Sequence, residues 1–243
     1  MTVTASRLVA TIVVAGCCAG MAPACTRAVD GSATAGSSGA SVPVTTSTTL
    51  RAPTGPVGPL LLSPTEFPPQ YSATTLSPDA ARMALRDIRG VPEAATVTPA
   101  ACAPAPLPAT LQDVAVAVGA NESDESTITV AVLRVPQPLA AYKTQVERCA
   151  SFTFTGADQI QGAVTASQAV APPINADDSV AVNQTVSPAG AGSGTQTTLS
   201  LIAQIGDIRI LATYMTFQGT EPDAVLLDQA FTAAVLKVHD SFR

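Results

Sequence analysis

The sequence predicts an α+β domain in which helices pack on one face of a mostly antiparallel sheet. Short stretches of alternating apolar and polar residues recur between positions 114 and 217, separated by turn residues, which is typical of β-hairpins. Helix-start signals, and a terminal segment with apolar residues three and four positions apart, indicate a few helices as well. We place this single domain at residues 58–243, after a signal segment (1–24) and a disordered stalk (25–57).

The first helix is predicted to begin after Ser77 and to end near Gly90. Ser77 is a favourable N-cap, because its side chain can accept a hydrogen bond from an unpaired backbone N–H of the first turn. Pro78 suits the first helical position and Asp79 complements the positive end of the helix dipole. Residues 80–88 should then form a short helix.

Most of the remaining chain is predicted to form strands. Residues 114–118 and 127–135 alternate in polarity and flank a polar turn, so they should pair as an antiparallel hairpin. Residues 138–149 between strands predict a helix, and the segment after Pro222 predicts an amphipathic terminal helix. The other strands are expected at residues 152–155, 163–170, 179–186, 197–205 and 208–217.

The first 24 residues predict an export signal. Arg7 is their only charged residue, and it precedes an apolar run at 8–14 and a segment rich in Ala, Gly and Cys. The run is much shorter than the roughly 20 apolar residues that a membrane-spanning helix requires. We therefore expect an exported chain rather than one with a permanent transmembrane helix.

Cys17 and Cys25 are the two candidates for lipid attachment. Residues 14–17, Val-Ala-Gly-Cys, resemble a bacterial lipobox, in which the cysteine thiol carries a diacylglycerol. Residues 26–31 resemble the start of mature mycobacterial lipoproteins, which favours Cys25, although Pro23 is unusual at that place. The sequence does not choose between the two, and secretion without a lipid is the alternative. Two or three acyl chains, palmitate among them, would anchor the chain to the outer face of the cell membrane, in the cell envelope.

The stalk contains mostly Ser, Thr, Gly, Ala and Pro. It has almost no large apolar residue, so it cannot bury enough surface to offset the entropy lost on ordering. We expect a disordered tether between the membrane and the cell wall. The Thr-rich run at 45–49 also resembles the O-mannosylated tracts of mycobacterial lipoproteins, and a plain linker is the alternative.

Two cysteines, Cys102 and Cys149, lie inside the predicted domain, whereas the other three belong to the N-terminal segment. An even number of cysteines in an exported domain favours a disulfide, and two separate buried thiols are the alternative. Neither a Cys-x-x-Cys pair nor a cluster of Cys and His is present in the sequence, so a structural zinc site lacks its ligands. The disulfide should be structural.

The composition argues against a nucleic-acid partner. The formal net charge is −6, and 12% of the residues are charged, so Lys and Arg are too few and too dispersed to neutralise phosphates. Hydrophobic residues make up 47% of the chain but aromatic residues only 4%, which predicts a core built from small side chains.

The sequence contains no recognisable catalytic, metal or cofactor motif. The only histidine, His239, lies near the C-terminus and is expected at the surface. The glycine-rich stretch at 190–194 lacks the Lys and Ser/Thr of a phosphate-binding loop. The acidic clusters at 122–125 and 177–178 lack the spacing of a calcium loop and are expected to be solvated turns. We therefore expect a protein that is not an enzyme and that uses no metal ion or cofactor.

The opening segment of the domain carries a resemblance. Residues 60–68, Leu-Leu-Leu-Ser-Pro-Thr-Glu-Phe-Pro, together with the Arg148–Cys149 pair and the N-terminal cysteines, resemble a family of uncharacterised mycobacterial lipoproteins. The chain is also distantly similar to the extracellular sensor domains of mycobacterial receptor Ser/Thr kinases. That likeness implies helices packed on an antiparallel sheet around a cleft. Those domains carry two disulfides, whereas this one has cysteines for a single disulfide.

Two functions follow as hypotheses. The first is a noncatalytic binding module of the cell envelope for a lipid or small apolar ligand, which predicts an open apolar cavity. The alternative is a protein-interaction or sensory module that acts on an envelope partner such as a kinase ectodomain or a wall enzyme. That alternative predicts a contiguous exposed apolar patch instead of a cavity.

Overall fold

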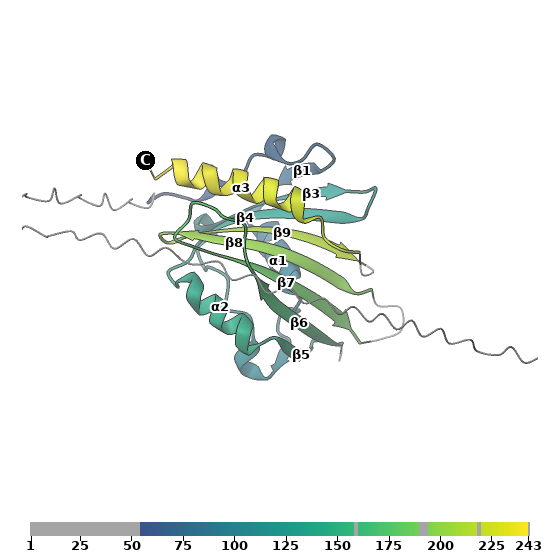
Figure 1. Cartoon of the computed structure of the whole chain (residues 1–243). Helices are drawn as coiled ribbons and strands as arrows, with labels where there is room; N and C mark the ends of the chain where they lie inside the picture. The colour runs from purple at the N-terminus through teal and green to yellow at the C-terminus, as the bar shows by residue number, and fades with distance from the viewer. Residues whose placement is uncertain (1–53, 158–159, 190–193, 218–219, 243) are drawn as a thin grey trace, which may run out of the picture. The chain divides into compact units, whose positions relative to one another are not determined.

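In a computed structural model of the chain, the described residues are 54–157, 160–189, 194–217 and 220–242 (Figure 1). The predicted signal segment, both candidate lipidation sites (Cys17 and Cys25) and nearly all of the predicted stalk lie outside these residues. Within the described part of the chain, none of the helices combines the length and the apolarity that a membrane span requires. Val57 is fully buried, so the folded part includes at least one residue before the predicted boundary at 58.

The domain contains one nine-stranded sheet in the order β1-β3-β4-β9-β8-β7-β6-β5-β2. All neighbouring strands are antiparallel. The strands are β1 (Ser72–Thr75), β2 (Thr96–Thr98), β3 (Val114–Asn121), β4 (Ser126–Arg134), β5 (Ser151–Thr155), β6 (Gln161–Ala169), β7 (Asp178–Pro188), β8 (Gln196–Ile205) and β9 (Ile208–Phe217). The α-helices are α1 (Pro78–Arg89), α2 (Leu139–Arg148) and α3 (Ala224–Asp240). The predicted α+β fold with a mostly antiparallel sheet is confirmed.

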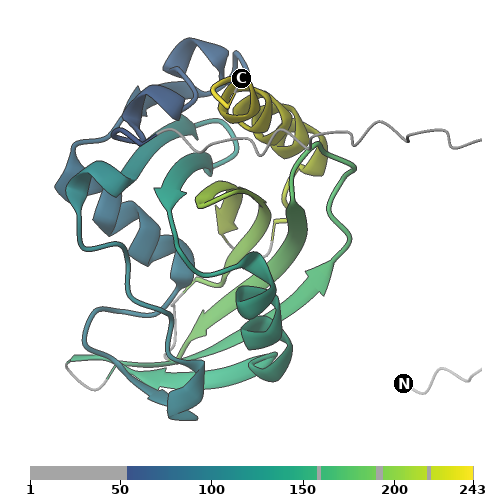
Figure 2. The ribbon, with the colours of Figure 1, turned by 90° about the vertical axis from the view of Figure 1, so that its left-hand side faces the viewer.

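Helices cover both faces of the sheet, whereas the sequence led us to expect them on one face. Helix α3 packs on one face, and α1 and α2 pack on the other (Figures 1 and 2). Residues 128–133 of β4 and 200–205 of β8 are buried without interruption. A strand that is buried at consecutive positions must be covered on both faces, because successive side chains point to opposite sides.

The two short edge strands, β1 and β2, were not predicted. Their burial patterns contain a single buried residue, Val97, because each strand pairs on one side only and lies at the rim of the sheet. Three or four residues without apolar alternation give no periodic signal. Their pairing depends on the neighbouring strands β3 and β5.

The ends of α1 are fixed by local chemistry, as predicted. The Ser77 side chain accepts a hydrogen bond from the backbone N–H of Ala80. Gly90 ends the helix with φ +67°, a conformation that favours glycine. A Cβ atom at Gly90 would lie 2.2 Å from Cγ2 of Val186, so the end of α1 approaches β7 more closely than any other residue allows.

The predicted disulfide between Cys102 and Cys149 is present. It joins the short 3-10 turn η3 (Ala100–Cys102) to the residue that ends α2. Both cysteines are buried in a small cluster with Val97, Phe154 and Val164. The bond therefore attaches α2 to the segment that follows β2.

Candidate ligand-binding site

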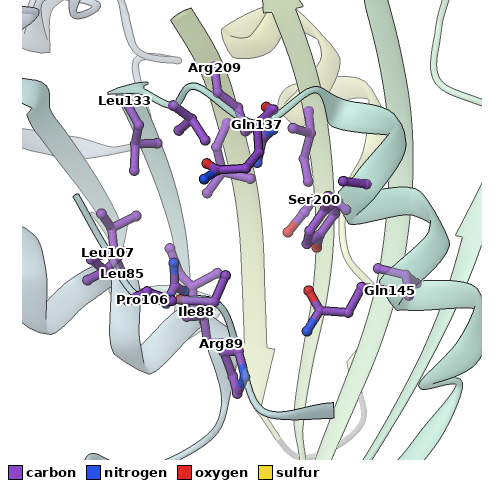
Figure 3. Close-up of a pocket in the computed structure, with 18 of the residues that line it drawn as sticks. Leu85, Ile88, Arg89, Pro106, Leu107, Leu133, Gln137, Gln145, Ser200 and Arg209 are labelled. Carbon is purple, nitrogen blue, oxygen red and sulfur yellow. Dashed lines mark hydrogen bonds between the residues drawn. The ribbon is translucent and has the colours of Figure 1, made fainter. Parts of the chain in front are cut away.

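A cavity of about 780 Å³ lies on the face of the sheet opposite α3. Its walls are α1 on one side and α2 on the other, and strands of the sheet form its floor (Figure 3). Residues 104–109 and 133–138 complete the lining. This volume lies in the usual range of small-molecule pockets, about 300–1,000 Å³.

The floor is formed by alternate residues of neighbouring strands. In a strand, residues i and i+2 point to the same face, and the antiparallel register brings equivalent positions side by side. Val182 lies opposite Ser200, and Ile202 lies opposite Leu211. The sheet thus presents a continuous surface of mostly apolar side chains with a few hydroxyl and amide groups. The floor residues are Phe152, Ala166, Val182, Gln184, Thr198, Ser200, Ile202, Arg209 and Leu211.

The two helical walls are mainly apolar. Leu85 and Ile88 of α1 line one wall, and Ala141 and Val146 of α2 line the other. Leu85 and Ile88 are three residues apart, and on α2 the lining residues Tyr142 and Gln145 lie four residues from Val146 and Ala141, so each set occupies one face of its helix. The same face of α1 also packs Leu85 against β3 and β4, and the same face of α2 packs Val146 against β7 and β8. The helices thus contact different strands and leave the space between them open.

A proline-rich segment, residues 103–110, closes one side of the cavity, and we name it the proline strap. Pro104, Pro106 and Pro108 alternate along it and have no backbone N–H to donate. The strap is held by side chains that donate to its carbonyl groups. Arg82 donates to Pro108 and Ala109, Arg89 donates to Ala105, and Gln145 donates to Ala103. Both helical walls therefore tether the strap.

Ion pairs and amide hydrogen bonds hold the segment between β4 and α2 at one end of the cavity. Arg134 Nη1 lies 2.6 Å from Asp207 Oδ2, and its Nε lies 3.3 Å from Asp113 Oδ1. The backbone oxygen of Gln137 accepts hydrogen bonds from Arg209 and from the Gln204 amide. Both aspartates that line the cavity are therefore paired with the same arginine.

Two other arginines reach the cavity at opposite ends, Arg209 and Arg89 (Figure 3). Burial lowers the pKa of both guanidinium groups, although an arginine still keeps its proton in a protein. Burial raises the pKa of the Tyr142 hydroxyl, and the positive charges of Arg89 and Arg209 oppose that shift. Tyr142 therefore lies within electrostatic reach of both cations.

The polar residues that the sequence singled out lie away from the cavity. His239 is on α3, on the other face of the sheet, where its Nε2 is 2.9 Å from the Asn175 amide. In the turn at 122–125, Asp124 accepts hydrogen bonds from Ser126. Asp178 pairs with Lys143, and residues 190–193 of the glycine-rich stretch lie outside the described residues. Across the described chain, no three His, Cys, Asp or Glu side chains are grouped to hold a metal ion.

Comparisons with known proteins give one family and several distant structural likenesses, among them the following two. The chain resembles the X-ray structure of an uncharacterized protein of Mycobacterium smegmatis, the Rv0999 ortholog, with 18% identity, a TM-score of 0.45, and coverage of 72% of this chain and 92% of that chain. It also resembles the extracellular domain of PknH from Mycobacterium tuberculosis, with 18% identity, a TM-score of 0.35, and coverage of 63% and 78%. No curated protein matches the chain.

A family model described as a domain of unknown function, DUF5642, matches residues 63–239. The match begins at the capped turn of Ser63, whose backbone N–H donates to Glu66, and it ends within α3. It therefore includes every strand of the sheet, all three α-helices except the last residue of α3, and the cavity between α1 and α2. Because the match spans well over half of the sequence, this protein belongs to the DUF5642 family.

Proposed function

We propose that this protein is a noncatalytic binding module of the cell envelope and that its cavity holds a lipid or another small apolar ligand. The observation that carries the proposal is the cavity of about 780 Å³ between α1, α2 and the sheet. Its walls consist largely of Leu, Ile, Val, Ala and Pro side chains. Apolar lining with a few convergent polar groups is the usual composition of a ligand pocket.

The chemistry of the lining supports binding rather than catalysis. Nucleophilic catalysis would need a serine or free thiol beside a general base. The Ser200 hydroxyl is 2.8 Å from the Thr213 hydroxyl, which is not a base, and Cys102 and Cys149 are joined to each other. Of the described lining residues, the only carboxylates are Asp113 and Asp207, and both form ion pairs with Arg134.

The exposed apolar residues favour a cavity over a docking patch. The large apolar side chains that are exposed in the described chain lie on separate elements or in separate loops, except for Val225 and Leu236, which are eleven residues apart on α3. Val170 follows β6 and is 96% exposed, and the others are Met83, Leu111, Ile160, Phe217, Val225 and Leu236. Single exposed apolar residues are common on monomeric proteins, whereas an interaction surface usually gathers them.

Export and lipid anchoring belong to the same proposal. A single lipidated cysteine, Cys17 or Cys25, would hold the domain at the outer face of the membrane. Metabolic labelling with palmitate tests this, because changing the acceptor cysteine to Ser should remove the label and the other change should not. Equal labelling of both single variants and of the double variant would contradict a lipid anchor.

A dye-displacement titration tests the cavity. The full chain carries Cys17→Ser and Cys25→Ser, so that no lipid is attached to it and no detergent is needed. A neutral apolar dye such as N-phenyl-1-naphthylamine reports binding. We expect Ala166→Phe to abolish dye binding, because Ala166 lines the floor on β6. Thr165→Phe is the matched control, since Thr165 is the preceding residue, is exposed and points to the opposite face. Equal binding by both variants, or none by the unmodified cavity, would contradict the proposal.

A further inference from the structure

The cavity carries positive charge within an acidic protein. The chain has a formal net charge of −6, yet the described lining contains three arginines, Arg89, Arg134 and Arg209, against two aspartates. Arg134 is paired with both aspartates. Neither Arg89 nor Arg209 has a carboxylate partner among the described residues, so the cavity offers two cations whose charge no neighbouring side chain neutralises.

Of these two cations, Arg209 is the better placed to bind an anionic group of a ligand. Its Nη2 donates to the Gln137 backbone oxygen and to the Gln204 side-chain oxygen, both at 2.9 Å. Its Nε is fully buried and has no hydrogen-bond partner within the described chain. A buried donor without a partner costs free energy, and a guanidinium cannot avoid that cost by losing its proton. An oxyanion in the cavity beside Arg209 would compensate the positive charge of this guanidinium.

The position of Arg209 suits the head group of an amphiphile. The neighbouring residues 136–138, which line the same end of the cavity, are exposed to solvent, so a polar head there would remain near water. Leu211, two residues further along β9, and Ile202, its partner on β8, also line the cavity. Ile88 of α1 lies near the other end, beside Arg89 (Figure 3). Figure 3 places Arg209 and Arg89 at opposite ends of the lining side chains.

Arg89, by contrast, holds the wall of the cavity. Its Nη1 donates to the Ala105 carbonyl of the proline strap, and Arg89 also lines a smaller neighbouring pocket together with Arg82 and Arg86. Its hydrogen bond therefore serves the wall between the two spaces. This makes Arg89 an internal control for charge that lines the cavity without holding the ligand.

We propose that the ligand of this cavity is an anionic amphiphile whose apolar chain lies on the floor between α1 and α2 and whose negatively charged head group binds the Arg209 guanidinium. This inference rests on the proposed function and adds the chemical class of the ligand. The apolar chain supplies burial, and the head group supplies a negative charge opposite the guanidinium. A neutral lipid of the same length would fill the same volume but would leave the charge of the guanidinium without a counter-charge.

The test compares oleate with oleyl alcohol, which has the same chain and no charge, on the full chain with Cys17→Ser and Cys25→Ser at pH 8. Each competes with the bound neutral dye below its micelle-forming concentration. We expect oleate to bind at least about ten-fold more tightly than the alcohol, because a hydrogen bond to a charged group contributes that much or more. Inorganic phosphate, the head-group charge without a chain, should not displace the dye at millimolar concentration.

Two matched variants test whether Arg209 is the residue that binds the head group. Arg209→Gln should bring the oleate-to-alcohol ratio near one while alcohol binding persists, and Arg89→Gln should keep the wild-type ratio. The ratio is measured on folded protein, with thermal melting as the check on folding. Loss of the ratio in Arg89→Gln, alone or equally with Arg209→Gln, would overturn the assignment to Arg209. If Arg209→Gln does not fold, Arg209→Met, which also removes the charge, replaces it and should likewise lose the preference for oleate.

The outcomes separate this inference from the proposed function. Equal binding of oleate and oleyl alcohol by the wild-type cavity would overturn the anionic class and leave an apolar binding module. Displacement by phosphate as effective as displacement by oleate would also overturn the amphiphile, because a free anion would then suffice. Binding of neither lipid would overturn both proposals.

Discussion

The two faces of the sheet are packed in different ways. On one face, Phe231, Leu227 and Val238 of α3 are fully buried against the central strands, and the segment that begins at Val57 belongs to the same cluster. On the other face, α1 and α2 each pack over a separate small cluster, and the space between them is the cavity. The comparison indicates that stability is concentrated on the α3 face and that ligand binding belongs to the other face.

The largest expected effect is the loss of a side chain from the α3 face. Phe231→Ala should lower the free energy of unfolding by about 3–5 kcal/mol, because it removes a fully buried aromatic ring and leaves a void. Denaturant unfolding measures this change. If the α3 face supplies stability and the other face binds the ligand, dye affinity in the molecules that remain folded should be unchanged. A large loss of dye affinity with little loss of stability would contradict this assignment of the two faces.

Removing the disulfide should be nearly as costly and should also affect the cavity. Cys102 and Cys149 are 47 residues apart in sequence, and removing a native disulfide from a small secreted domain typically costs about 2–5 kcal/mol. The double change to Ser frees the end of α2 from the segment before the proline strap. Dye affinity in the folded state should therefore fall as well, in contrast to Phe231→Ala. Unchanged affinity would mean that the disulfide does not hold the cavity wall.

Enlarging a small side chain tests the packing of each face. Ala234 on α3 is fully buried, so Ala234→Phe should overpack the core and cost about 1–3 kcal/mol. Ala166→Phe projects into the cavity and should change stability by less than about 1 kcal/mol, since the space is already open. Thermal unfolding of the two variants compares the faces directly. Equal destabilisation by the two variants would contradict the conclusion that the α3 face is fully packed and the other face is open.

A small effect on stability is also expected at the proline strap. Arg82 Nη2 donates to the carbonyl oxygens of Pro108 and Ala109, at 3.0 and 2.7 Å. Arg82→Ala should cost no more than about 1–2 kcal/mol, because the bonds are partly exposed. It should speed dye release in a stopped-flow experiment, because one tether of the strap is lost.

Arg86→Ala is the control for the strap. Arg86 lies on the same helix, one turn further along, and pairs with Glu93 instead of the strap. Release should therefore stay at the wild-type rate. Faster release from both variants would point to a general loosening of α1, and an unchanged rate in Arg82→Ala would exclude the strap from ligand exchange.

The sequence predicted the individual helices and strands better than it predicted which face of the sheet each helix covers. The end signals of α1, the hairpin of β3 and β4, and the strands from β5 to β9 are local patterns, and the structure confirms them. The distribution of helices over two faces depends on which strands lie at the centre of the sheet, and local periodicity does not report that order. The consecutive apolar residues 130–133 were the signal available in the sequence, because a strand that is apolar at successive positions is covered on both faces.

The cavity could not be predicted from local patterns, because its lining comes from the sheet, from α1 and α2, and from two connecting segments, which are distant in sequence. Residues as distant in sequence as Leu85 and Leu211 face the same space. Two signals were present all the same. Alternating prolines at 104, 106 and 108 indicate a segment that cannot pair within a sheet, and Arg209 is the only charged residue of the strand 208–217.

The most direct test of the account is native mass spectrometry of the exported full chain with Cys17→Ser and Cys25→Ser, beside the same chain with Ala166→Phe. The account predicts that the first protein carries an additional mass in the range of a lipid, or gains one on incubation with oleate, and that Ala166→Phe carries none. A wild-type cavity that stays empty at oleate concentrations well above those of the protein, or equal adducts on both proteins, would contradict the claim that this cavity is a ligand-binding site.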